Sequence, residues 1–139
     1  MPIEAKAYGP DSTPEEVKAL RDLVSLHQEG VILLQEPPVV SEFQADVCYG
    51  RIEELLRAHP RSALIIDLRQ TGRPSAEVRE VLRRWFVRLG DRLRSVAVFT
   101  GKNFLLNIAA KFVLAGVPQP FSVHKTLEEA EEAVRNVAR

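Results

Sequence analysis

The chain is poor in the residues that build metal centres and disulfides. Its 139 residues include one cysteine, Cys48, and three histidines, His27, His59 and His124. A single cysteine rules out an intramolecular disulfide and a cysteine-rich zinc site, so we expect no metal and no other cofactor. Cys48 itself falls within a predicted helix, where a small buried residue is the simplest interpretation.

The sequence also lacks net charge and long apolar runs. Nineteen basic residues balance nineteen acidic ones, so charge gives no reason to expect nucleic acid as a partner. No apolar run approaches the roughly 20 residues that cross a bilayer, and the N-terminus lacks the basic and apolar regions of a signal peptide. We therefore expect no membrane span and a cytoplasmic location.

Familiar catalytic motifs are missing as well. The chain contains no Gly-x-Ser-x-Gly elbow, no Walker loop and no Rossmann glycine triplet. A rhodanese or cysteine phosphatase needs a cysteine in a loop after a strand, whereas Cys48 falls within a helix. A dehalogenase-type phosphatase needs a second acid two residues after the first, but Arg69 stands two residues after Asp67. The sequence therefore predicts no catalytic residues and a protein that is not an enzyme.

The strongest positive signal is the apolar run Ala63-Leu-Ile-Ile-Asp67. Such a run is typical of a strand that is buried on both faces in a parallel sheet. Further strands are predicted at 31–34, 95–99 and 121–123. Because they alternate with predicted helices, we expect an α/β sandwich with a mixed, mostly parallel sheet of four or five strands and helices on both faces. This single domain covers residues 13–139, and residues 1–12 form a flexible lead-in that stays out of the core.

Capping residues mark where the helices begin. Capping boxes are predicted for Thr13 with Glu16, Ser41 with Gln44 and Thr126 with Glu129, and Ser75 is the predicted cap of a further helix. Helical spacing predicts buried stripes of Phe43, Val47, Ile52, Leu55 and Leu56; of Val78, Val81, Leu82, Trp85, Phe86 and Leu89; and of Leu127, Ala130, Ala133, Val134 and Val137. The polar side of the helix after Ser75 includes Arg79, Arg83, Arg84 and Arg88, which predict a solvated face; recognition of an acidic partner or lipid headgroups is the alternative. Residues 23–28 fit either a helix or a strand.

The order of these elements resembles a known family. The resemblance rests on the segments Leu64-Ile-Ile-Asp67-Leu-Arg, Val96-Ala-Val-Phe-Thr100, Ala110-Lys-Phe112 and Phe121-Ser-Val-His-Lys-Thr-Leu127-Glu-Glu-Ala130. From about Leu23 to the C-terminus the pattern is similar to STAS domains, within them to the small bacterial branch resembling the sporulation anti-sigma-factor antagonist. The resemblance implies a hairpin over residues 23–34. It also implies a non-enzymatic regulatory module of bacterial signalling that binds a protein partner or forms a homodimer, or that binds a lipid or other apolar ligand.

The phosphorylated turn of the antagonists is not reproduced. Those proteins resemble one another in an Asp-Ser-Ser-Gly turn after the central strand, whereas this chain reads Arg69-Gln-Thr71-Gly-Arg-Pro-Ser75. Ser75 occupies a comparable place and Thr71 precedes a glycine, so both are candidates for phosphorylation beside Arg73. Ser75 is also explained by a capping role alone, which is worth about 1 kcal/mol.

Phospho-receiver domains provide the alternative resemblance. Asp67, Thr100 and Lys125 follow the order of the acceptor aspartate, the switch threonine and the lysine of that family. However, the strand at 31–34 leads into Gln35-Glu36 without the acidic pair that holds magnesium, and a receiver has a further strand and helix before its acceptor. A degenerate receiver with Asp67 as acceptor is therefore the alternative function, together with a small lipid carrier.

Two neighbouring segments are predicted binding surfaces. Thr100, Gly101, Lys102 and Asn103 precede a helix and offer N–H groups and a cation to an anion, although a glycine turn with a capping asparagine explains the same residues. The helix that follows, to Ala115, is apolar nearly all round. This composition fits either a fully buried helix or an interaction face for a dimer, a partner or a lipid pocket. The face is expected to include Phe104, Leu105, Leu106 and Leu114.

Overall fold

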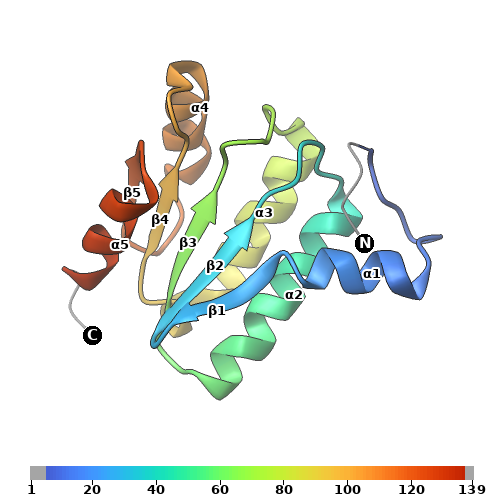
Figure 1. Ribbon diagram of the computed structural model, residues 1–139, viewed down its shortest axis with the longest axis horizontal. Helices are drawn as coiled ribbons and strands as arrows, with labels where there is room; N and C mark the ends of the chain where they lie inside the picture. The colour runs from blue at the N-terminus through green and yellow to red at the C-terminus, as the bar shows by residue number, and fades with distance from the viewer. Residues whose placement is uncertain (1–5, 137–139) are drawn as a thin grey trace.

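A five-stranded sheet runs through the centre of the computed structural model, which describes residues 6–136 (Figure 1). Its strands are β1 (Val24–Gln28), β2 (Val31–Gln35), β3 (Ala63–Asp67), β4 (Val96–Phe99) and β5 (Phe121–His124). They lie side by side in chain order; β1 pairs antiparallel with β2, and every later pair is parallel. The predicted mixed, mostly parallel sheet is confirmed, and residues 24–28 form a strand.

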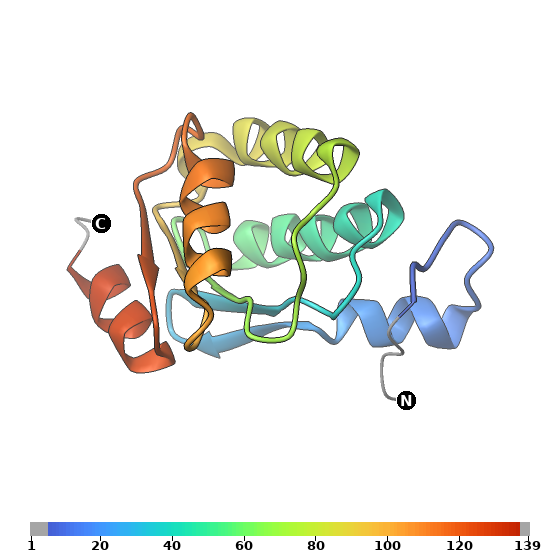
Figure 2. The same cartoon turned by 90° about the horizontal axis from the view of Figure 1, so that it is seen from above.

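Five α-helices cover the two faces of this sheet. They are α1 (Pro14–Arg21), α2 (Glu42–Ala58), α3 (Ala76–Leu89), α4 (Phe104–Leu114) and α5 (Leu127–Arg135), and a 3₁₀ turn (Gly90–Arg92) follows α3. Because the strands are added in one direction by right-handed crossovers, α2, α3 and α4 share one face (Figure 2). Helix α5 packs on the other face, against β3, β4 and β5. No helix within residues 6–136 has the length and apolarity that crossing a bilayer requires.

The predicted caps are present in the structure. The hydroxyl groups of Thr13, Ser41 and Thr126 each accept a backbone N–H three residues later, and each capping box closes with the predicted Glu or Gln. The hydroxyl of Ser75 accepts the N–H of Val78 at 3.2 Å. These bonds satisfy N–H groups that have no partner inside the helix, so local sequence determines where four of the helices begin.

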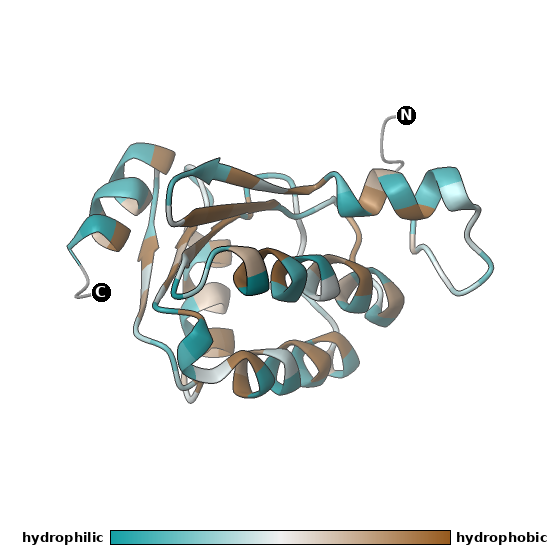
Figure 3. Cartoon of the chain, turned by 90° about the horizontal axis from the view of Figure 1, so that it is seen from below, coloured by the Kyte–Doolittle hydropathy of each residue, from teal (hydrophilic) through white to brown (hydrophobic). Residues whose placement is uncertain are grey.

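The core has two layers, one on each face of the sheet. Strand β3 is buried at all five positions, as predicted, and Figure 3 shows apolar residues along the central strands. Even-numbered residues of β3, such as Leu64 and Ile66, face α2, α3 and α4, whereas Ala63 and Ile65 face α5. Full burial of one such aliphatic side chain stabilises the fold by about 1.5–3 kcal/mol. The central strand therefore holds both layers together.

The predicted buried stripe of α2 is wrong in its first half. Phe43 and Val47 are only partly buried, whereas Ala45, Cys48 and Tyr49 are in the core. Tyr49 is 1% exposed and packs edge-on against Phe86 of α3, with ring centroids 5.5 Å apart. The sheet and α3 thus pack against the side of α2 that carries Tyr49. The expected inward position of Val137 in the last helix lies outside the described residues.

The lead-in contains a core residue, contrary to the prediction. Tyr8 is 5% exposed, and its N–H donates to Oε1 of Gln44 at 3.0 Å. The same Oε1 accepts the N–H of Ser41. Gln44 therefore closes the capping box of α2 and also binds the segment that precedes the helix. An isolated tyrosine in a stretch without periodicity gives no sign of this contact. Residues 1–5 of the lead-in lie outside the described part of the chain.

Candidate functional site

Helix α4 presents apolar side chains on both of its sides. Leu106, Ala110 and Leu114 face inward and are buried. On the outside, Phe104, Leu105, Ile108 and Phe112 are 73%, 77%, 51% and 63% exposed. Because α4 leads to the edge strand β5, no further helix follows on its face of the sheet to cover its outer side.

The predicted interaction face was therefore wrong for two residues. Leu106 and Leu114 are 6% and 4% exposed, so they belong to the core side of α4. Phe104 and Leu105 lie on the exposed side as predicted, and Ile108 and Phe112 belong with them. A helix that is apolar nearly all round has no polar stripe to show which side faces solvent, which is why the sequence did not separate the two sets.

An outer groove runs between α4 and the loop after β3. It has a volume of about 480 Å³. Its lining residues are Thr71, Gly72, Arg73, Asn103, Leu105, Leu106, Ile108, Ala109 and Phe112. Arg73, Lys102 and Lys111 are exposed at or near it, and the chain contains no acidic residue from 92 to 127. The groove therefore combines apolar side chains with positive charge, and it joins the two regions that the sequence predicted as contact surfaces.

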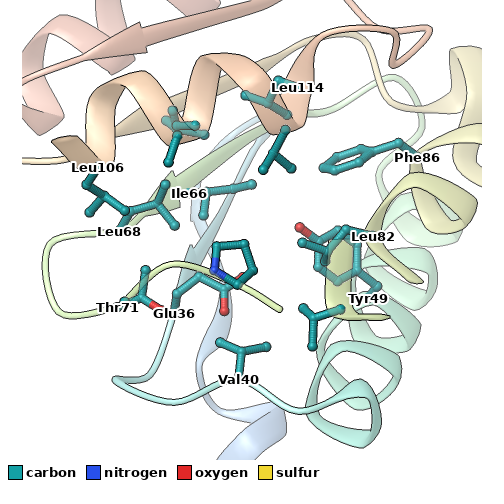
Figure 4. A pocket seen from close by; sticks show the side chains of 17 residues that line it. Glu36, Val40, Tyr49, Ile66, Leu68, Thr71, Leu82, Phe86, Leu106 and Leu114 are labelled. Carbon is teal, nitrogen blue, oxygen red and sulfur yellow. The ribbon is translucent and has the colours of Figure 1, made fainter. Parts of the chain in front are cut away.

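An inner cavity lies on the other side of α4, between this helix, the sheet, α2 and α3 (Figure 4). About 70 Å³ of it is open to the centres of water-sized molecules. Its apolar wall includes Tyr49, Ile66, Leu82, Phe86, Val98, Ala110, Val113 and Leu114. Thr71, Gly72, Leu106 and Ala109 line both the inner cavity and the outer groove, so these four residues separate the two spaces.

Among the described residues, Glu36 is the only Asp or Glu in the wall of the inner cavity. It follows β2, and its backbone N–H donates to the carbonyl of Asp67 at 3.0 Å, which fixes it at the carboxyl end of the sheet. Glu36 also lines a second, polar cavity with Asp22, Gln35, Asp67 and Arg69, so the residue is partly exposed. Its carboxyl group is nevertheless enclosed enough that burial raises its pKa to about 7.

Tyr49 supplies the second polar group of the inner cavity. Burial raises the pKa of its hydroxyl well above the usual value, and the carboxyl of Glu36 adds to this effect. Within residues 6–136, neither this hydroxyl nor the Glu36 carboxyl has a hydrogen-bond partner. The sequence analysis missed both residues. The one available sequence signal was the position of Glu36, an acid at the carboxyl end of β2, which lies beside the carboxyl end of β3.

The two predicted phosphorylation candidates have different surroundings. Ser75 is exposed and acts as the cap of α3. Thr71 lies four residues earlier, where its N–H donates to the carbonyl of Leu68 at 3.3 Å, and it is part of both the groove and the inner cavity. The structure thus places Thr71, but not Ser75, at the candidate binding site.

Asp67, the candidate acceptor of the receiver interpretation, is held by Arg69. Its carboxylate accepts Nε and Nη2 of Arg69 at 3.1 and 2.9 Å, and it also accepts the Arg69 backbone N–H at 3.0 Å. Thr100 is 2% exposed, and its hydroxyl lies 3.5 Å from the carbonyl of His124. The described residues contain no group of three or more His, Cys, Asp or Glu that would hold a metal ion. Both oxygens of the Asp67 carboxylate are therefore already bound to Arg69.

The predicted anion-binding loop has already used several of its donors. The N–H groups of Thr100 and Gly101 donate to the carbonyls of His124 and Lys125, both at 3.0 Å. Gly101 has a φ of +66°, and Oδ1 of Asn103 accepts the N–H of Leu106 at 3.0 Å. These bonds favour the second interpretation of this segment, a glycine turn followed by a capping asparagine.

No protein-family model matches the chain, and a search of curated proteins gives no match. The geometry of the groove and the inner cavity is therefore the basis for inferring a function.

Proposed function

We propose that this protein is a non-enzymatic, STAS-like regulatory module that binds a partner protein in the outer groove between α4 and residues 71–73. The observation that carries this proposal is the row of exposed Phe104, Leu105, Ile108 and Phe112 on one side of α4. Contiguous apolar surface of this kind, rimmed by polar residues, marks an interaction site. An amphipathic segment laid along a groove is a common form of such recognition.

Charge indicates what kind of partner fits the groove. Lys102, Lys111 and Arg73 are exposed around it, and residues 92–127 include no acid. A symmetric homodimer through α4 would bring these like charges together, which opposes association. A segment of another protein with apolar side chains flanked by acidic ones is complementary on both counts.

Site-specific photo-crosslinking in the native cell tests this function. A photoreactive amino acid in place of Phe112 should yield a defined protein adduct, because the side chain is 63% exposed in the groove region. The matched control carries the same group in place of Val87, which is 67% exposed on α3. We expect no such adduct from the control.

Two second-site substitutions sharpen the crosslinking result. Ile108→Glu places a charge in the apolar row, and Lys111→Glu reverses the charge beside it; both should remove the adduct. Both positions are exposed, so each substitution should change the free energy of unfolding by only about 0.5 kcal/mol. Adducts that consist of a second copy of this chain, of lipid alone, or of the same proteins at both positions would contradict the proposal.

A further inference from the structure

The inner cavity has a charge character opposite to that of the outer groove. Its wall includes one acid, Glu36, and no Lys, Arg or His. The remaining lining residues are apolar or neutral. The lining of the outer groove, by contrast, includes Arg73 and no acid. A ligand that fits one of these spaces is therefore a poor electrostatic match for the other.

The polar groups of the inner cavity are not used by the fold. Figure 4 shows Glu36, from the segment after β2, and Tyr49, from α2, among the side chains directed into the cavity. Neither has a hydrogen-bond partner within residues 6–136. A ligand that supplies a partner to each of these two groups would therefore gain hydrogen bonds without breaking any bond of the fold.

The size of the cavity limits the ligand to a compact molecule. A water needs about 10–15 Å³ of volume measured in this way, so the 70 Å³ available corresponds to about five waters. A branched alkyl group or a small ring with one polar substituent fits this space. A long-chain lipid does not fit unless α4 moves away from the sheet.

We propose that the inner cavity binds a compact apolar amine, whose ammonium group pairs with the Glu36 carboxylate and donates to the Tyr49 hydroxyl while its hydrocarbon part contacts the apolar wall. This site is distinct from the proposed docking groove and does not depend on that function. A carboxylate ligand is disfavoured, because it would face Glu36 without a cation to neutralise it. A neutral alcohol has a hydrogen bond to gain, but no charge pair.

The ionisable groups around Glu36 are either neutral or already paired with another residue. From α2, Cys48 and Tyr49 face it, and burial raises the pKa of both, so both stay neutral. From the segment after β3, Asp67 and Arg69 form an ion pair with each other. Asp22, after α1, is paired with Lys18 at 2.9 Å. No ionisable residue of α3 or α4 lines the inner cavity or the polar cavity beside it.

Three small molecules of nearly equal shape test the proposal directly. Isoamylamine, isoamyl alcohol and isovalerate share one branched chain and differ in charge: positive, neutral and negative. We would titrate each into the full-length protein at pH 8 and follow binding by nuclear magnetic resonance shifts of the methyl groups of Ala110 and Leu114. The amine should bind about tenfold more tightly than the alcohol. Only the amine forms a charge pair with Glu36, and a pair shielded from water should contribute a binding free energy equal to a pKa shift of about one unit or more. Isovalerate should show no binding.

The pH dependence separates a charge pair from a neutral hydrogen bond. With the Glu36 pKa at about 7, the ionised fraction rises roughly tenfold between pH 6 and pH 8. An alkylamine stays protonated over this range, as a lysine side chain does. Binding of isoamylamine should therefore strengthen by up to about tenfold on going from pH 6 to pH 8. Binding of isoamyl alcohol should not strengthen.

Variants assign the effect to the two polar groups. Glu36→Gln keeps the shape but removes the charge, so it should reduce amine binding to the level of the alcohol and abolish its pH dependence. Tyr49→Phe should weaken both ligands severalfold. Glu54→Gln is the control, because Glu54 lies on the same helix as Tyr49 but outside the cavity, and it should change neither. Equal binding of amine and alcohol, preference for isovalerate, an unchanged Glu36→Gln variant, or no binding of any of the three would overturn the proposal.

Discussion

Glu53 is buried and Glu36 is half-buried, and the two glutamates have opposite surroundings. The side chain of Glu53, on α2, is 8% exposed. It accepts Arg88 Nε and Arg92 Nη2, each at 3.0 Å, and Arg57 Nη2 at 3.4 Å. Hydrogen bonds from Arg88 and Arg92 hold its pKa below the usual value. Glu36 has no such partner in the described part of the chain, and its pKa is raised to about 7.

The difference distinguishes an acid that holds the fold together from one that is free to bind. Glu53 joins α2 to the end of α3 and to the turn after it, because Arg88 and Arg92 come from those segments. Both of its carboxylate oxygens already accept hydrogen bonds from arginines. Glu36 contributes no such link, and its exposure to a cavity leaves its carboxyl available. Buried acids without partners are concentrated at binding and catalytic sites for this reason.

Placing a second acid in the inner cavity would test this contrast most severely. Leu114→Glu puts a carboxyl at a position that is 4% exposed and has no cation in the cavity wall. We expect the free energy of unfolding to fall by about 4 kcal/mol or more, from lost apolar packing and the burial of a polar group. Urea unfolding followed by circular dichroism measures this loss. Phe112→Glu, on the exposed side of the same helix, is the control and should cost less than about 1 kcal/mol. Similar losses in both variants would mean that the two sides of α4 are not as described.

Removing the compensated acid should have the next largest effect. Glu53→Gln deletes charge-assisted bonds to three arginines, and we expect a loss of about 2–3 kcal/mol. Glu54→Gln provides a matched control one residue away: Glu54 binds Arg21 and Arg51, but its side chain is 41% exposed, so its loss should stay near 1 kcal/mol or below. Since the pKa of Glu53 is lowered in the fold, its stabilisation is present above about pH 4.5 and is lost as the pH falls below that value. Equal losses in the two variants would contradict the role given to Glu53.

Most of the fold was predictable from short patterns in the sequence. The apolar run at β3 indicated a central strand, and Ser41, Thr13 and Thr126 indicated where helices begin, because these signals depend on local backbone chemistry. The ambiguity over residues 24–28 was settled only by pairing with β2, which is a contact between chain segments. Tyr8 and Tyr49 were missed for the same reason, since their burial depends on what surrounds them.

The candidate site was less predictable, because it is defined by pairs of distant residues. Phe104 and Leu105 were expected on an interaction face, but only the packing of α4 on the sheet shows that Leu106 lies on the opposite side. The arginines of α3 were expected to be solvated, and Arg88 is exposed as expected. It also pairs with Glu53, 35 positions away in sequence, which no local pattern indicates. No local pattern distinguishes Glu36 from Glu53, because their difference lies in which neighbours the fold brings to each.

The stability of the protein as a function of pH provides the last and smallest test of the comparison. Because the pKa of Glu36 is about 7 in the fold and near 4.5 when unfolded, the folded chain holds its proton more tightly between these values. The free energy of unfolding should therefore fall as the pH rises from 4.5 to 7 and should level off above pH 7. The whole pKa shift of Glu36 corresponds to about 3 kcal/mol, and its partial exposure lowers our expectation to about 2 kcal/mol. Glu36→Gln should remove this decline and be more stable than the unmodified protein by about that amount at pH 8, as measured by urea unfolding across the range. If the variant instead proved less stable at pH 8, the carboxylate of Glu36 would have a partner in the fold, and its contrast with Glu53 would disappear.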